Sequence, residues 1–301
     1  MEQQTLKIET FEESLYRFEV ELTGGRYRSA FYLIPEGGGV LIEPGPTANL
    51  PSILKGMKHL GLEGLSYIIP THIHMDHGGG AGKLAGLFPQ ARVVVHPRGL
   101  QHMLDPTRLI AGTKAAYGED FEALYGPILP VPEGQLTVPN EGESLDIPGR
   151  KLQVVYTPGH APHQIALFDT KTGGLFCGEA LGALLPGEEE VILPSVSVQD
   201  FNPDLYLETI GKLKRLEPRV LYYSHEGAIR EPERVFRRLE ETMRLIRRIT
   251  FEGLKNGETI ETIVKRISEN LPGLHNTQAH SAYLKETILG CFHYYTRQGL
   301  L

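Results

Sequence analysis

A cluster of three histidines and one aspartate within six residues constrains this chain more than any other feature of its sequence. The cluster reads His72-Ile73-His74-Met75-Asp76-His77. Imidazole nitrogens and carboxylate oxygens are ligands that zinc, iron and manganese accept. Residues 65–69, just before it, are apolar and predict a buried strand, and the glycines at 78–80 predict a turn that opens a helix. Because side chains at a strand end and in the following loop can converge on one point, the cluster predicts a metal site.

The composition favours a globular cytoplasmic protein. The chain has 301 residues, 41% hydrophobic and 22% charged, which suits one large domain with or without a smaller appendage. A net charge of −7 argues against general nucleic-acid binding. Two cysteines without a C-x-x-C spacing fit a reducing compartment. Residues 1–10 are polar, so we expect no signal peptide, and no apolar stretch approaches the ~18 residues that a membrane span needs.

Short apolar strands and helical segments alternate along the first 230 residues. Strands are predicted at 15–22, 30–34, 40–42, 65–69, 92–95, 144–147, 152–156, 164–168, 175–177 and 220–223. A helix capped by Asn49 is predicted to run to Leu60, and another spans 200–216. A helical insertion at about 97–126 is expected to break at Pro106 and Gly112.

The character of the sequence changes near residue 230. Apolar residues at i, i+3 and i+4 predict helices over 235–251, 259–268 and 281–297. We therefore predict two domains, an α/β or α+β domain over 1–230 and a C-terminal helical region over 231–301.

Three further ionisable residues each follow a predicted strand. His160 comes after 152–156, Glu179 after 175–177, and His225 after 220–223. Any one of them alone fits a hydrogen-bonded structural residue. Together with the first cluster they repeat one arrangement, a strand followed by a ligand-type side chain. Solvated surface histidines are the alternative interpretation of the first cluster, but they fit its apolar and glycine-rich flanks less well.

On these residues the chain resembles the metallo-β-lactamase superfamily. The resemblance covers roughly residues 10–230 and includes the glycine turn after the first cluster and the segment Thr157-Pro158-Gly159-His160. It implies a four-layer αββα sandwich with metal ions at one edge of its two sheets, here with a C-terminal helical extension.

The resemblance also implies a site for two divalent metal ions, with zinc favoured and iron or manganese as alternatives. The first ion would be held by His72, His74 and His160. The second ion would be held by Asp76, His77 and His225. Glu179 would lie between the ions beside a bridging hydroxide, with Asp76 as the catalytic carboxylate.

Two residues depart from the family pattern. Glu179 stands where the family usually has aspartate, and its extra methylene leaves three options: it bridges both ions, binds one, or changes their spacing. Glu43 stands where relatives often carry aspartate. It either contacts a ligand histidine or serves as a turn residue.

The implied activity is hydrolysis of a carboxylic ester, lactone or thioester in a small-molecule substrate. His163, on the loop after His160, is a candidate substrate contact, with an ordinary loop histidine as the alternative. We expect no membrane partner, and a homodimer is compatible with the sequence.

Three alternative functions are compatible with the sequence. A phosphodiesterase or nuclease would share the ligand set, but the chain lacks a continuous basic stripe for long nucleic acids. A di-iron protein that binds or reduces dioxygen or nitric oxide is disfavoured because flavodiiron relatives carry glutamate at the position of His74. A non-catalytic protein on the same fold is disfavoured by the complete ligand set.

Overall fold

The computed structural model describes residues 6–12, 14–21, 28–184, 192–225, 227–271, 274 and 278–301. The chain divides into two units. The first unit comprises 1–156, 163–178 and 221–228, and the second comprises 157–162, 179–220 and 229–301. The domain boundary near residue 230 stays a prediction, because the second unit draws segments from both sides of it.

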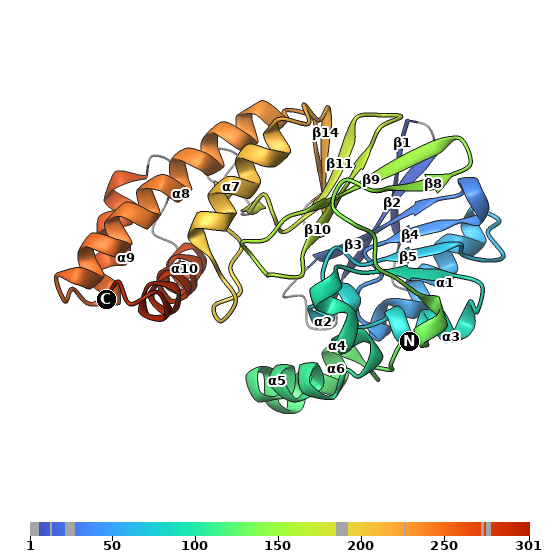
Figure 1. Ribbon diagram of the computed structural model, residues 1–301, viewed down its shortest axis with the longest axis horizontal. Coiled ribbons are helices and arrows are strands. Elements are labelled where there is room, and N and C mark those ends of the chain that lie inside the picture. Colours follow the sequence, from blue (N-terminus) through green and yellow to red (C-terminus); the bar gives the residue numbers. More distant parts are fainter. Residues whose placement is uncertain are drawn as a thin grey trace. The chain divides into compact units, whose positions relative to one another are not determined.

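The first unit contains a mixed sheet with strand order β1-β2-β3-β4-β5-β6-β7 (Figure 1). Its strands are β1 (Lys7–Phe11), β2 (Leu15–Glu21), β3 (Arg28–Ile34), β4 (Val40–Ile42), β5 (Tyr67–Ile69), β6 (Arg92–Val94) and β7 (Leu136–Thr137). The pairs from β1 to β4 are antiparallel, and those from β4 to β7 are parallel. Helices α1 (Leu50–His59) and α3 (Ala81–Leu87) lie within the crossovers between the parallel strands β4, β5 and β6. The strands predicted for this first sheet are confirmed to within two residues at each end.

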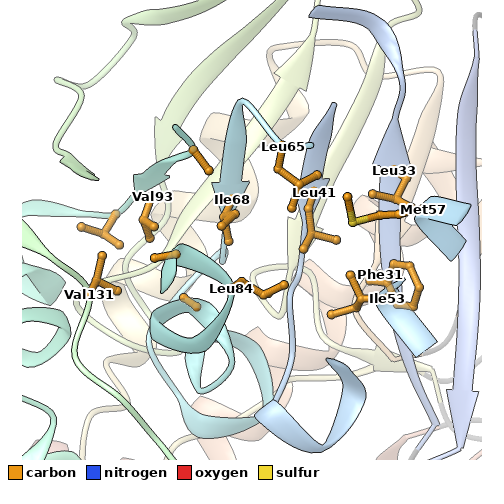
Figure 2. Packing of buried hydrophobic residues seen from close by; sticks show 14 of the residues in the cluster. Phe31, Leu33, Leu41, Ile53, Met57, Leu65, Ile68, Leu84, Val93 and Val131 are labelled. Atoms are coloured by element: carbon orange, nitrogen blue, oxygen red, sulfur yellow. The ribbon is translucent and has the colours of Figure 1, made fainter. Parts of the chain in front are cut away.

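One face of this sheet packs on helices α1 and α3 (Figure 2). The contacting side chains come from β3 to β6 and from the inner faces of the helices. They include Phe31, Leu33, Leu41, Ile68, Val93, Ile53, Met57 and Leu84. Full burial of a side chain of this size stabilises the fold by about 1.5–3 kcal/mol. This hydrophobic core therefore holds β5 in place, and β5 is the strand that leads into the histidine cluster.

The second sheet has the strand order β15-β14-β11-β10-β9-β8. Its strands are β8 (Ser144–Ile147), β9 (Arg150–Tyr156), β10 (Ile165–Asp169), β11 (Gly174–Gly178), β14 (Val220–Tyr223) and β15 (Ala228–Ile229). Tyr32 of β3 packs its ring against Phe176 of β11 and Tyr222 of β14, with ring centroids 5.2 and 5.6 Å apart. These aromatic contacts join the two sheets face to face.

The helical insertion consists of α4 (Leu100–Leu104), α5 (Thr107–Tyr117) and α6 (Phe121–Tyr125). The predicted break at Pro106 is confirmed. The predicted break at Gly112 is wrong, because α5 continues through it. A glycine inside a helix costs only about 1 kcal/mol relative to alanine, and a helix with other contacts absorbs that cost.

The second unit is mainly helical, with α7 (Pro203–Lys214), α8 (Pro232–Lys255), α9 (Ile260–Asn270) and α10 (Gln278–Arg297). A small sheet pairs β12 (Ala183–Leu184) with β13 (Ile192–Leu193). Buried side chains of the last three helices form one core, which includes Ile246, Ile263, Ile267, Leu284 and Ile288. The predicted C-terminal helices are confirmed, as is the α+β class with two sheets. Across the described residues, no helix combines the length and apolarity that crossing a membrane requires.

Helix capping differs from the prediction. Asn49 adopts helical dihedrals before α1 and makes no capping hydrogen bond through its side chain, so that prediction is wrong. Asn202 instead caps α7, because its side-chain oxygen accepts hydrogen bonds from the backbone N–H groups of Asp204 and Leu205 at 3.1 Å. A cap of this kind stabilises a helix by about 1 kcal/mol.

Candidate metal centre

The first two histidines of the cluster lie directly beyond the end of β5. His72 Nε2 and His74 Nδ1 are 2.9 Å apart, close enough for one cation to contact both. His72 is buried, and its Nδ1 lies 3.2 Å from the Thr71 hydroxyl. This contact holds the ring of His72 so that its Nε2 points toward His74.

Asp76 and His77 lie in a helical turn rather than in the loop that the sequence predicts. Helix α2 spans Met75–Gly78 and begins directly after His74. Met75 is buried against Phe121 and Tyr125 of the helical insertion, and this contact explains why the chain turns into a helix so early. A single turn does not separate the ligand-type side chains, since the rings of His72 and His77 remain 3.9 Å apart at their centroids.

His225 joins Asp76 and His77 from the end of β14. These three residues offer ligand atoms that lie within 4.8 Å of one another. Asp76 Oδ2 is 3.5 Å from His77 Nε2 and 3.7 Å from His225 Nε2. The first unit by itself therefore brings five ligand-type side chains into one cluster, two from the end of β5, two from α2 and one from the end of β14.

Strand β3 positions the segment that carries His225. The Ala30 N–H donates to the Ser224 carbonyl, and the Tyr32 hydroxyl donates to the Tyr223 carbonyl, both at 2.6 Å. Burial raises the pKa of Tyr32 well above its usual value, so the hydroxyl keeps its proton and remains a donor. The two hydrogen bonds fix the backbone directly before His225.

Glu43 contacts a candidate ligand, which decides between its two predicted roles. Its Oε2 lies 2.8 Å from His77 Nδ1, and both side chains are buried. Because a carboxylate only accepts, Nδ1 carries the proton and Nε2 is left to face Asp76. Glu43 also has a backbone φ of 60°, a left-handed conformation that costs a non-glycine residue roughly 1–2 kcal/mol.

Replacing Glu43 by alanine is expected to weaken metal binding about 10- to 100-fold, the usual effect of losing such a partner of a ligand histidine. Glu43→Gln is the matched control, because its amide oxygen can still accept from His77 Nδ1 and should keep most of the affinity. Competition with a chelator would measure the dissociation constants. Equal affinity in Glu43→Ala and wild type would refute a role for Glu43 in binding.

The second unit contains a separate pair of ligand-type side chains. His160 Nε2 and Glu179 Oε2 are 2.9 Å apart. His160 Nδ1 donates to the Ser195 carbonyl at 3.2 Å, so the proton of this ring sits on Nδ1. The Ser195 hydroxyl donates to Glu179 Oε1 at 2.6 Å. The arrangement leaves His160 Nε2 and Glu179 Oε2 facing each other.

Glycine precedes each member of this pair for steric reasons. Gly159 has a φ of 141°, and a Cβ there would lie 2.5 Å from the Tyr206 Cα. Gly178 has a φ of 55°, and a Cβ there would lie 2.5 Å from the Thr71 Oγ1. Any residue with a Cβ would push the neighbouring chain away in both places. These contacts explain the glycines in the motifs that precede His160 and Glu179.

His163 lies beside the histidine cluster of the first unit. It is buried, and its ring centroid is 5.3 Å from that of His74 and 6.1 Å from that of His72. Its role as a substrate contact stays a prediction. The assignment of all seven ligand candidates to two ions, and the catalytic role of Asp76, also stay predictions.

His96 and Ser195 are the notable residues outside the predicted set. Burial, together with the Arg98 charge, lowers the pKa of His96 to about 4. Its Nδ1 accepts from the Arg98 backbone N–H at 3.0 Å, so this imidazole is neutral and structural at neutral pH. Sequence reasoning missed Ser195, although it follows a strand as the other candidates do, because β13 has only two residues.

A comparison of the sequence with protein families agrees with the fold. The family model described as the Metallo-beta-lactamase superfamily matches residues 23–225. The chain therefore belongs to the metallo-β-lactamase superfamily, which confirms the resemblance.

The chain is also similar to several named proteins. The chain is 27% identical over 222 residues to the metallo-beta-lactamase fold-containing protein ST1585 of Sulfurisphaera tokodaii, covering 72% of this chain and 81% of the relative. A crystal structure of ST1585 superposes with a TM-score of 0.64 at 19% identity, covering 93% of this chain and 98% of that one. A hydroxyacylglutathione hydrolase of a Synechococcus species is 30% identical, with 48% and 47% covered. An N-acyl homoserine lactonase of Bacillus cereus is 29% identical, with 54% and 57% covered.

Proposed function

We propose that this protein is a metal-dependent hydrolase of carboxylic esters, lactones or thioesters. The observation that carries the proposal is the convergence of His72, His74, Asp76, His77 and His225 in the first unit. Imidazole and carboxylate are donors that suit zinc, manganese and iron, so the residues present fit divalent cations. Held there, two such cations would supply an activated water at neutral pH and a Lewis acid for the substrate oxygen.

Chain connectivity supports the assignment of His160 and Glu179 to the same centre. Thr71 is the residue before His72, and its carbonyl accepts a hydrogen bond from the Ile165 N–H at the start of β10. Gly178 at the end of β11 packs on the same Thr71. His160 lies five residues before Ile165, and Glu179 directly follows Gly178. We therefore propose that His72, His74, His160 and Glu179 hold one ion, and that Asp76, His77 and His225 hold the other.

The protein's own residues would then divide the work. Asp76 is partly exposed and lies between His77 and His225, so we assign it to accept the proton of the attacking water. Glu43 keeps the His77 proton on Nδ1 and thereby presents Nε2. His163 is placed beside His74, where it would contact the substrate acyl group.

The substrate class rests on chemistry and on two relatives. A hydroxyacylglutathione is a thioester, and an N-acyl homoserine lactone is a cyclic ester. Both are carbonyl compounds that yield a carboxylate on hydrolysis. The net charge of −7 and the lack of a basic stripe favour such small substrates over nucleic acids.

A substrate panel tests the proposal. Purified protein stripped with a chelator and reloaded with zinc, manganese or iron(II) would be assayed on an aryl ester, an acyl thioester, an acyl lactone and a bis-aryl phosphodiester. We expect turnover of at least one carboxylic substrate, lost on stripping and restored on reloading. Turnover of the phosphodiester alone, or of none, would contradict the proposal.

A further inference from the structure

We propose that Ser195 is a positioning residue that selects which oxygen of Glu179 faces the metal site, and that it makes glutamate rather than aspartate necessary at position 179. The inference rests on the proposed function, since it concerns two of the proposed ligands. All of its contacts lie within the second unit.

Ser195 contacts both members of the ligand pair. Its hydroxyl donates to Glu179 Oε1 at 2.6 Å, and its carbonyl accepts from His160 Nδ1 at 3.2 Å. One residue thus determines the proton position on the imidazole and occupies one oxygen of the carboxylate. The other oxygen, Oε2, lies 2.9 Å from His160 Nε2. Glu179 is therefore turned so that it and His160 would serve the same ion.

These contacts require a side chain as long as that of glutamate at position 179. Oε1 reaches Ser195 while Oε2 reaches His160 Nε2, both within hydrogen-bonding range. Removing one methylene would draw the carboxylate back by about one bond length, ~1.5 Å. An aspartate on the same backbone would then lose at least one of the two contacts. The presence of Ser195 accounts for the departure of Glu179 from the family pattern.

Tyr206 of α7 holds Ser195 and Glu179 at this spacing. Its hydroxyl accepts from the Ser195 N–H and donates to the Glu179 carbonyl, both at 3.3 Å. Its backbone also packs on Gly159, the residue before His160. Tyr206 is fully buried, so its hydrogen bonds fix the backbones of Ser195 and Glu179. The Ser195 hydroxyl is thereby held in place.

A double-mutant cycle with zinc as the probe tests the inference. The variants are Ser195→Ala, Glu179→Asp and the two combined, each stripped and titrated with zinc against a competing chelator. Each single variant is expected to bind zinc about 10- to 100-fold more weakly. The combined variant should bind within about threefold of Glu179→Asp, since Ser195 acts through the longer carboxylate. Ser268→Ala removes a hydroxyl that only donates to the Val264 carbonyl in α9, and its zinc affinity should match that of wild type.

Thermal unfolding of the metal-free proteins separates positioning from simple stabilisation. A positioning role leaves the melting temperature of metal-free Ser195→Ala close to wild type and reduces the rise that zinc produces. An equal loss in the metal-free and zinc-loaded forms would overturn the inference. So would zinc affinity of Ser195→Ala within twofold of wild type, or losses that multiply in the combined variant.

The same measurements distinguish the two proposals. Wild-type protein that binds zinc but hydrolyses nothing would refute the proposed function and leave the Ser195 result intact. An active wild type with an unaffected Ser195→Ala would refute only the inference. Wild-type protein that binds none of zinc, manganese and iron(II) would refute both.

Discussion

The combined variant His72→Ala and His77→Ala is expected to bind no stoichiometric metal and to melt at a lower temperature than wild-type protein as purified. His72 pairs with His74, and His77 pairs with Asp76, so the two histidines belong to different proposed ion sites. Losing both would remove a ligand from each proposed ion. A ligand at 100 times its dissociation constant stabilises a fold by about 2.7 kcal/mol, so the expected loss is at least several degrees.

Elemental analysis and thermal unfolding would measure these effects. Chelator-stripped wild type gives the reference, since it should melt at the same temperature as the variant. His59→Ala with His293→Ala is the matched control, because both lie on helices outside the cluster and should leave metal content unchanged. Undiminished metal content in His72→Ala with His77→Ala would contradict the ligand assignment.

Replacing Tyr32 by alanine is expected to cost about 3–5 kcal/mol of unfolding free energy, the usual range for truncating a large buried aromatic residue. Its ring lies between the two sheets against Phe176 and Tyr222, and its side chain is 1% exposed. Tyr32→Phe keeps the ring but leaves the Tyr223 carbonyl without this donor, and should cost about 1–3 kcal/mol.

Denaturant unfolding of metal-free protein would measure both Tyr32 variants. Tyr67→Phe removes a hydroxyl from a partly exposed tyrosine in the first sheet and should change stability by less than about 0.5 kcal/mol. Because the Tyr223 carbonyl lies two residues before His225, Tyr32→Phe should also weaken metal binding. Unfolding of Tyr32→Phe at the wild-type denaturant concentration would show that the hydrogen bond contributes nothing.

The strands were predictable because of how they are buried. The parallel strands β4, β5 and β6 are covered on both sides, so they read as short continuous apolar runs. The position of the ligand candidates followed from the same pattern, since a polar residue after such a run must lie at the sheet edge. The strand-then-ligand arrangement therefore singled out His72, His160, Glu179 and His225 as ligand candidates without any structure.

Other features depend on contacts that the sequence does not display. Helix α2 forms because Met75 packs on Phe121 and Tyr125, which lie more than forty residues later. Glu43 meets His77 across 34 residues, and a left-handed glutamate has no sequence signature. Ser195 follows a two-residue strand that is too short for periodicity to detect. Pairwise contacts of this kind orient the candidate side chains. The local sequence shows only that these side chains follow strands.

We propose that this chain assembles a two-metal hydrolytic centre from side chains that follow its strands and from helix α2. Anomalous diffraction at the zinc edge, from crystals of full-length protein grown with zinc, tests it most directly. We predict two anomalous peaks per chain, one touching Asp76, His77 and His225 and the other touching His72, His74, His160 and Glu179. Crystals without anomalous peaks at these residues, with the imidazoles pointing apart, would contradict the claim.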